Sequence, residues 1–319
     1  MVLDQRQLPG AIVRRTLGHL AEVAEAIRTL TVRGAPTLGV AAAYGMVLGQ
    51  RADGLGVDEA AGILRGTRPT AHDLFVGIAE VERVWRAGQD TLSAAAAYER
   101  QVVEECHAIG EVGAPLVGPG ARVLTHCNAG ALATVAWGTA LAPIRVAFLS
   151  GRDPFVWVDE TRPLLQGSRL TAWELQQEGI RHAVIADNAA GYFLGRGEVD
   201  LVIVGADRIT RSGDFANKVG TYEKAVLARE NGVPFYVAAP WSTFDETLRR
   251  GDEIPVEERS GEEVRNFAGI ATAPEGSPVR NPAFDLTPHR FVRGFITPDG
   301  VLAPEELEGH LRARKRPLL

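Results

Sequence analysis

Acid, amide and ammonium side chains are gathered in one stretch, residues 201–222, which reads LVIVGADRITRSGDFANKVGTY. Its apolar start at 201–204 has the pattern of a buried strand and ends in two small residues, after which Asp207 follows. Asn217 and Lys218 come later, just before a helical pattern. Open α/β sheets bind ligands beyond the carboxyl ends of their strands, so this stretch is predicted to form half of an active site.

The thiol of Cys127 follows another short apolar run, residues 123–125, and a helix N-terminus after it would stabilise a thiolate. An acid facing a thiol across a cleft suits proton transfer between adjacent carbons. Two interpretations stay open for each group. Cys127 is either a nucleophile or proton carrier, or a buried structural cysteine; Asp207 is either a catalytic acid, or a partner of Arg208 or a helix cap. His126 is predicted to point into the sheet packing, because neighbours on a strand face opposite ways.

Two basic turns are candidate anion sites. Arg33, Gly34 and Ala35 precede Pro36, and proline is well tolerated in the first turn of a helix, so a helix is predicted to begin there. Free amides and the helix dipole favour a phosphate at such a terminus. The alternative is a tight interhelical turn with an exposed arginine. Arg68 lies in a second basic turn, where a surface position is the competing interpretation.

Secondary structure must position these residues, and the pattern of apolar residues changes along the chain. Up to about residue 120 helical periodicity dominates, with helices predicted near 20–30, 36–50, 72–87 and 91–109. After the Gly/Pro-rich segment 113–120, short apolar runs alternate with helical stretches, at 123–125, 155–158, 183–186, 201–204 and 235–238 and at 130–142, 168–178, 189–196 and 218–231. This alternation predicts a parallel sheet with right-handed crossovers.

The predicted fold is therefore α/β, with a smaller, mostly helical N-terminal domain (residues 1–119) that contributes the basic turns. A Rossmann-like C-terminal domain with a parallel sheet (residues 120–319) follows. No GxGxxG motif follows its first strand, so the fold does not imply a dinucleotide here.

Composition narrows the class of protein. The chain has 319 residues, 45% hydrophobic and 23% charged, with a formal net charge of −6. It offers no sign of a nucleic-acid or membrane partner, so a local basic cluster is interpreted as a site for a small anion. There is no apolar run of about 18 residues and no signal-peptide pattern, and we expect a cytoplasmic protein. The two cysteines, Cys106 and Cys127, make neither a disulfide framework nor a four-thiolate zinc site, and Cys106 is predicted to be a packing residue.

Several long motifs, in order over residues 2 to about 297, resemble the methylthioribose-1-phosphate isomerase family. They are VLDQRQLP, VRGAPTLGVAAAYG, TRPTA, LTHCNAGALAT, DETRPLLQGSRLTAWEL, VIVGADRITRSGDFANKVGTY, PFYVAAPWSTFD, IPVEERSGEEV and NPAFDLTPHRFVRGFIT. The resemblance implies an aldose–ketose isomerase of methionine salvage that converts 5-methylthioribose 1-phosphate to 5-methylthioribulose 1-phosphate.

Site residues follow from the matching motifs. Cys127 of HCNAG and Asp207 of GADRI look like the catalytic pair. The resemblance implies that substrate is bound by Arg33, Gly34 and Ala35 of RGAP, Arg68 of RPTA, Gln166 of the QG pair, and Asn217 and Lys218 of ANK. It implies neither a metal nor an organic cofactor. It also implies that the protein is a homodimer and that the molecule it binds is a small sugar phosphate.

The sequence departs from the family pattern after RPTA, where many members have Val-Asn and this chain has His72-Asp73. That departure leaves the pocket near Arg68 open to question. Alternative functions are isomerisation of ribose 1,5-bisphosphate or 5-deoxyribose 1-phosphate, or non-catalytic sensing of sugar phosphates or nucleotides. Regulatory subunits of the translation initiation exchange factor share the fold but generally lack the catalytic pair, so Cys127 and Asp207 argue against sensing.

Overall fold

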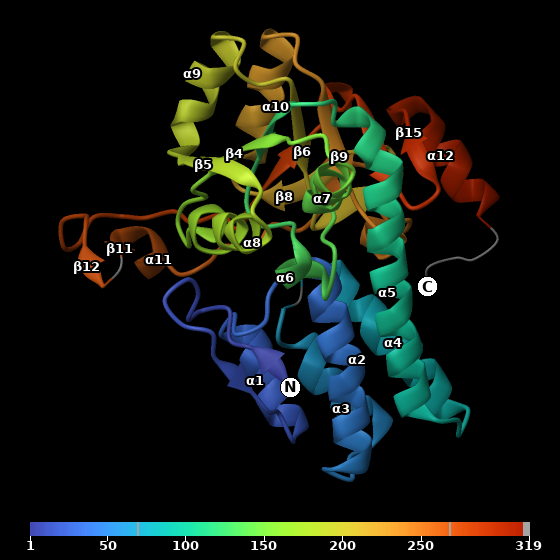
Figure 1. The fold of residues 1–319 in the computed structure, drawn as a ribbon. Helices are drawn as coiled ribbons and strands as arrows, with labels where there is room; N and C mark the ends of the chain where they lie inside the picture. Colours follow the sequence, from blue (N-terminus) through green and yellow to red (C-terminus); the bar gives the residue numbers. More distant parts are fainter. Residues whose placement is uncertain (69, 268, 315–319) are drawn as a thin grey trace.

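The computed structural model describes residues 1–68, 70–267 and 269–314. A helical region formed by the first part of the chain lies against a sheet flanked by helices, and the long helix α5 extends along both (Figure 1). The fold prediction is confirmed, whereas the boundary at 119/120 stays a prediction. Within the described residues, no helix is both long and apolar enough to cross a membrane.

In the described part of the first region there are five helices, and α2 lies at its centre. The contact between α2 and α4 requires glycine, because a Cβ on Gly77 would lie only 2.0 Å from the carbonyl oxygen of Gly39. The small residues of α2 therefore let a second backbone approach closely. Cys106 is fully buried on α5, as predicted. The helices are α1 (Leu20–Arg28), α2 (Ala35–Arg51), α3 (Val57–Arg65), α4 (His72–Arg86) and α5 (Thr91–Gly113).

A seven-stranded sheet forms the second region, in the order β15-β14-β9-β6-β3-β4-β5. All neighbouring strands are parallel except β15, which pairs antiparallel with β14. Parallel strands end at one edge, so the loops after them converge there. The strands are β3 (Arg122–Thr125), β4 (Phe155–Asp159), β5 (Arg181–Ile185), β6 (Leu201–Val204), β9 (Phe235–Ala238), β14 (Gly294–Thr297) and β15 (Gly300–Leu302).

Helices cover both faces of this sheet, because its central strands are apolar on both sides. On β6, Leu201 and Ile203 belong to the core shared with α5, α7 and α8, while Val202 and Val204 face the core shared with α9, α10 and α12. The covering helices are α7 (Leu141–Leu149), α8 (Ala172–Glu178), α9 (Ala190–Gly195), α10 (Thr221–Glu230) and α12 (Pro304–Ala313).

A second sheet has four strands in the order β10-β7-β8-β13, and its strands come after the carboxyl ends of strands of the large sheet. It shows that one prediction was wrong. Residues 218–231 were predicted to be helical, but Asn217 and Lys218 end strand β8, and α10 begins only at Thr221. β8 pairs antiparallel with both β7 and β13, contacts that local periodicity does not reveal. The strands are β7 (Arg208–Thr210), β8 (Phe215–Lys218), β10 (Phe244–Asp245) and β13 (Phe284–Thr287).

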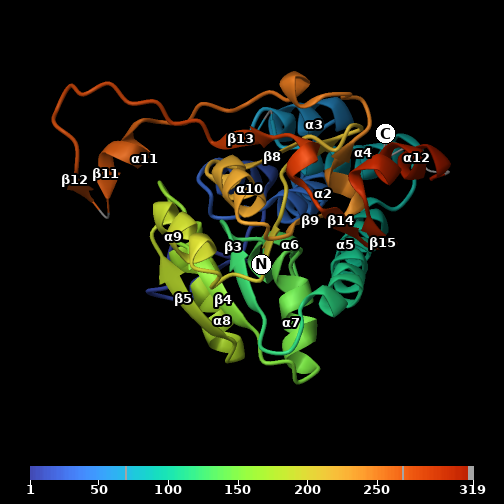
Figure 2. The ribbon, with the colours of Figure 1, turned by 90° about the horizontal axis from the view of Figure 1, so that it is seen from above.

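The helix predicted at 130–142 is interrupted. A short α6 (Ala131–Thr134) ends where Val135 and Trp137 take positive φ, and α7 begins later. The remaining elements lie at the periphery, and α11, β11 and β12 sit on a segment that projects from the body (Figure 2). They are β1 (Val2–Leu3), β2 (Arg14–Arg15), α11 (Glu262–Arg265), β11 (Asn266–Phe267) and β12 (Ile270–Ala271).

Candidate active site

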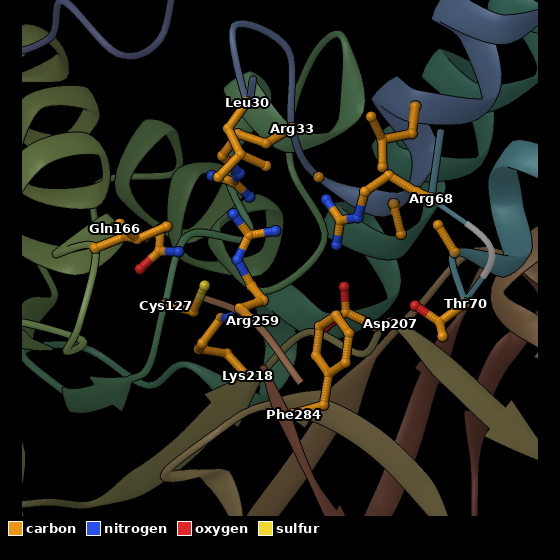
Figure 3. A pocket seen from close by; sticks show the side chains of 15 residues that line it. Leu30, Arg33, Arg68, Thr70, Cys127, Gln166, Asp207, Lys218, Arg259 and Phe284 are labelled. Carbon is orange, nitrogen blue, oxygen red and sulfur yellow. The ribbon is translucent and has the colours of Figure 1, made fainter. Parts of the chain in front are cut away.

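One cavity collects most of the residues singled out in the sequence (Figure 3). Asn217 lines an adjoining cavity, whose wall also contains Cys127 and Asp207. The structure thus brings residues of both regions together, while their roles in binding and catalysis stay predictions. Those that line the first cavity are Arg33, Gly34, Ala35, Arg68, Cys127, Gln166, Asp207 and Lys218.

Cys127 is held through its backbone just beyond the end of β3. Its φ is +63°, a left-handed conformation that is uncommon for a residue with a side chain. Its N–H donates to Thr161 Oγ1 at 2.9 Å, and its carbonyl oxygen accepts from Thr171 Oγ1 at 2.7 Å. Burial raises the pKa of the thiol, while Arg33 and Lys218 act to lower it. The resting group is accordingly a neutral thiol with two cations close by.

Asp207 faces Cys127 from the opposite side of the cavity, in the turn between β6 and β7 (Figure 3). Its N–H donates to the carbonyl oxygen of Ala216 at 2.9 Å. Within the described residues, no group donates a hydrogen bond to its carboxylate. Burial raises the pKa of Asp207, while Lys218 and then Arg68 act to lower it. A desolvated acid without hydrogen-bond donors favours the protonated form, which is what a general acid requires.

The RGAP turn lies at the start of α2, where the sequence placed it. Gly34 has φ +96°, and a Cβ there would lie 2.4 Å from Cα of Ala133, so only glycine fits. Gly34 and Ala35 both line the cavity at the N-terminus of α2, a setting that suits an anion. The guanidinium of Arg33 donates to Asn128, from Nη1 to Oδ1 at 2.6 Å and from Nη2 to the carbonyl oxygen at 2.7 Å.

Gln166 offers an acceptor that the rest of the described chain does not use. Its side chain is buried, and Oε1 has no hydrogen-bond partner there. An unsatisfied buried acceptor is costly, so a hydroxyl donor from a ligand would be favourable. The following Gly167 packs tightly, because a Cβ there would lie 1.7 Å from the carbonyl oxygen of Asp159.

Lys218 and Asn217 end β8 with different surroundings. The Lys218 ammonium donates to the carbonyl oxygen of Ala283 at 2.7 Å and lies 5.1 Å from the centre of the Phe284 ring. Burial lowers the pKa of Lys218, opposed by Cys127 and Asp207.

Asn217 is turned toward the following helix. Its Nδ2 donates to Thr221 Oγ1 at 2.9 Å, which fixes β8 to the start of α10. In this arrangement the amide supports the strand that carries Lys218.

Two charged residues of the site were missed by sequence reasoning. Arg259 lines the cavity, and Glu257 joins it to Arg68: Arg68 Nε donates to Glu257 Oε2 at 3.2 Å, and Arg259 Nη1 donates to Oε1 at 3.0 Å. Burial acts to raise the pKa of Glu257, but the two arginines hold it below its usual value. Both residues belong to the motif IPVEERSGEEV. This motif contributed to the family resemblance, but no site residue was assigned from it.

The charges of this wall suit an anion. Counted formally, the cations Arg33, Arg68, Lys218 and Arg259 outnumber the carboxylates Asp207 and Glu257 by two, and protonation of Asp207 would raise the surplus to three. A phosphate dianion therefore meets complementary charge. The wall also has an apolar part, formed by Leu30, Leu38, Ala71, Leu164 and Phe284.

Asp73, the residue that departs from the family pattern, is buried on the acid side of the site. It is 0% exposed, and its carboxylate accepts hydrogen bonds from Ser242 Oγ at 2.6 Å and Thr243 Oγ1 at 3.3 Å. Burial raises the pKa of Asp73 to about 7, and the nearby Asp207 acts in the same direction. Thr243 lines the adjoining cavity together with Asp207, so Asp73 contacts the wall without lining the cavity itself.

Comparisons with known proteins show the family to which the chain is similar. The model of the initiation factor 2 subunit family matches residues 31–304. Methylthioribose-1-phosphate isomerase of Geotalea uraniireducens is 48% identical, covering 98% of this chain and 95% of that protein. The crystal structure of 5-methylthioribose 1-phosphate isomerase from Pyrococcus horikoshii has a TM-score of 0.87 at 43% identity, covering 97% of this chain and 91% of that one.

A second solved structure bears another name. The translation initiation factor eIF-2B, subunit delta, from A. fulgidus has a TM-score of 0.82 at 43% identity, covering 95% of this chain and 93% of that one. Fold and identity alone thus do not separate the two names, and the residues of the site must be considered with them. With the site motifs present in the sequence and 48% identity to a named isomerase over nearly the full length of both proteins, this chain belongs to the methylthioribose-1-phosphate isomerases within the initiation factor 2 subunit family.

Proposed function

We propose that this chain isomerises 5-methylthioribose 1-phosphate to 5-methylthioribulose 1-phosphate in methionine salvage. The observation that carries the proposal is the placement of Cys127 and Asp207 on opposite sides of one cavity with surplus positive charge. The cations and the amides at the start of α2 bind the phosphate, and the apolar wall receives the methylthio end of the sugar.

Asp207 acts as the acid that opens the ring. Phosphate on the anomeric carbon prevents opening as a free hemiacetal, so the bond between C1 and the ring oxygen must be cleaved with a proton delivered to that oxygen. The pKa of Asp207 is raised by burial, which keeps the proton available. Cleavage leaves a C1 cation that the phosphate oxygen stabilises and an Asp207 carboxylate that can take a proton back.

Two routes complete the reaction. In the first, a base removes the proton from C2, and the resulting enol gains a proton at C1 while its C2 hydroxyl loses one. In the second, the C2 hydrogen moves to C1 with its electron pair while the C2 hydroxyl proton leaves. In the first route Cys127 must first lose its own proton, which Arg33 and Lys218 favour, and the resulting thiolate is the base; in the second route Cys127 manages the hydroxyl proton.

Deuterium at C2 distinguishes these routes. Full retention of the label in the product favours transfer with the electron pair, because that hydrogen never meets solvent. Loss of label to water identifies proton abstraction through the enol.

The substrate assay tests the function itself. Purified protein is incubated separately with 5-methylthioribose 1-phosphate, ribose 1,5-bisphosphate and 5-deoxyribose 1-phosphate, and ketose formation is measured. We expect the highest kcat/KM for the methylthio sugar. Turnover of the bisphosphate alone would reassign the enzyme, and binding of sugar phosphates or nucleotides without any ketose would identify a sensor.

Assembly and location are proposed from the family. We expect a cytoplasmic homodimer that binds no nucleic acid. Sedimentation equilibrium gives the mass in solution, and cell fractionation gives the compartment. A monomer would contradict the proposed homodimer. It would not contradict the proposed activity, which the isomerase assay tests.

A further inference from the structure

His126 lies directly before Cys127 and is enclosed in the protein, with 1% of its surface exposed. Its Nε2 is 2.9 Å from the carbonyl oxygen of Val219, and its Nδ1 is 2.9 Å from Asp159 Oδ2. A carbonyl oxygen can only accept, so Nε2 carries a proton and donates it. The ring therefore connects the end of β3 to β4 on one side and to the residue after Lys218 on the other.

A buried ammonium completes this group. Lys224 Nζ lies 3.4 Å from Asp159 Oδ2 and donates to the carbonyl oxygen of Asp187 at 2.8 Å. Oxygen and nitrogen atoms of His126, Asp159 and Asp187 lie within 4.8 Å of one another, a spacing that could hold a metal ion. The Lys224 ammonium already supplies the positive charge at this place, so the group is better understood as a salt-bridged support.

The support reaches both functional side chains through the backbone. Cys127 has positive φ and is fixed by Thr161, so rotation at His126 would reorient the thiol. On the other side, a Cβ on Gly220 would lie 2.9 Å from Cε1 of His126, so the chain after Lys218 passes close against the ring.

We propose that His126 is a positioning residue that fixes the thiol of Cys127 and the ammonium of Lys218 relative to each other. The proposal rests on the proposed function of these two groups. The Asp159 contact orients the ring and the thiol side, and the Val219 contact holds the lysine side. A residue that served stability alone would not divide its effects in this way.

Two amide variants separate the contacts. The amide nitrogen of His126→Asn comes near the place of Nδ1 and keeps the Asp159 contact, whereas that of His126→Gln reaches toward Nε2 and keeps the Val219 contact. We expect His126→Asn to raise KM roughly tenfold with a small change in kcat, because Lys218 is loosened. We expect His126→Gln to lower kcat roughly tenfold at nearly unchanged KM, because the thiol is misoriented.

Readouts that do not depend on turnover accompany the kinetics. In a Cys106→Ala background Cys127 is the only thiol of the chain, and its alkylation by iodoacetamide is followed against pH. Inorganic phosphate is the probe for the cation side, through its protection of the thiol. His126→Asn should weaken protection roughly tenfold at a wild-type alkylation rate, and His126→Gln should change the alkylation profile while protection stays at the wild-type level.

The outcomes distinguish this proposal from the proposed function. If the parent protein shows no turnover but the alkylation pattern divides as expected, the function fails and the positioning role stands. Equal effects in both variants, or none, overturn the positioning role. Circular dichroism checks folding. Lys224→Gln replaces His126→Gln if the latter does not fold, and Gly220→Ala, which presses on the ring from the Val219 side, replaces His126→Asn.

Discussion

The thiol side and the acid side of the cavity are built in different ways. Cys127 is fixed by hydrogen bonds at both its N–H and its carbonyl, to Thr161 and Thr171. The Asp207 carboxylate receives no hydrogen bond from the described residues, and its environment acts mainly through burial. The contrast indicates that the protein controls the position of the thiol and the protonation state of the acid.

The neighbouring residues extend this contrast. On the thiol side, Asn128 Nδ2 donates to Glu174 Oε1 at 2.8 Å, and Glu174 Oε2 accepts from the N–H of Ala131 at 2.7 Å, which caps the start of α6. On the acid side lies Asp73, which among the described residues accepts hydrogen bonds from hydroxyls and none from a cation. Directed polar contacts predominate on one side and desolvation on the other.

Replacement of the thiol should have the largest effect. Cys127→Ser keeps the backbone contacts but removes an acidic, polarisable group, and we expect kcat to fall by about 10² to 10⁴ with wild-type thermal stability. Steady-state kinetics and a thermal melt measure both quantities. Cys106→Ala is the matched control, since this thiol lies in the helical core, and it should keep full activity. Near-normal turnover in Cys127→Ser would show that the thiol of Cys127 takes no part in the reaction.

Asp207→Asn should lower kcat by a comparable factor, about 10² to 10⁴, because an amide cannot deliver the proton to the ring oxygen. The parent enzyme should also lose kcat as pH rises through the raised pKa of Asp207, since only the protonated acid is active. A pH profile of kcat measures this decline. A flat profile at alkaline pH would contradict control by protonation on the acid side.

Asp73→Asn tests, through the free energy of unfolding, whether burial controls the protonation of groups on the acid side. The pKa of Asp73 is about 7 in the folded protein against an ordinary value of 3.8, so the folded state holds the proton more tightly. The free energy of unfolding should therefore fall as pH rises from about 4 to about 7, by at most about 4 kcal/mol from this group.

Asp73→Asn removes that dependence, so its advantage over the parent should grow with pH. Urea unfolding at pH 5 and pH 8 measures the difference. A constant difference between the two proteins would show that Asp73 does not titrate in this range.

The smallest effect is expected from the arginine that joins the acid side to Glu257. Arg68→Ala removes a charged phosphate donor, and KM should rise roughly 10- to 100-fold with little change in kcat. Glu257→Gln is the matched comparison, because it frees Arg68 from its carboxylate partner and should lower KM or leave it unchanged. An unchanged KM in Arg68→Ala would exclude Arg68 from phosphate binding.

Local sequence information predicted the parts of the site that depend on local structure. The strand before Asp207 and the helix after Gly34 follow from apolar runs and from a proline in the first helical turn. Asn217 and Lys218 were assigned to a helix entrance because their strand is defined by pairing with β13, a partner distant in the sequence. Arg259 was missed for the same reason, since its link to Arg68 through Glu257 exists only in the folded chain.

One further difference has a local cause that periodicity does not report. The helix expected at 130–142 is broken by positive φ at Val135 and Trp137, which are not helix-breaking residue types. The folded chain tolerates them because Thr134 Oγ1 bonds within the turn, donating to the carbonyl oxygen of Ala136 and accepting from the N–H of Gly138.

The missing side chain at Gly34 has a consequence for protein engineering. A methyl group at this position would overlap Ala133 of α6, the short helix that follows Cys127 in the chain, and the backbone conformation excludes other residues as well. Saturation of this codon under selection should return glycine alone. Grafting the helical region onto the sheet of a distant relative would succeed only where that relative has an equally small residue opposite. The junctions of a chimera should therefore lie outside the turn at Gly34 and the segment that contains Cys127 and Ala133, so that both come from the same parent protein.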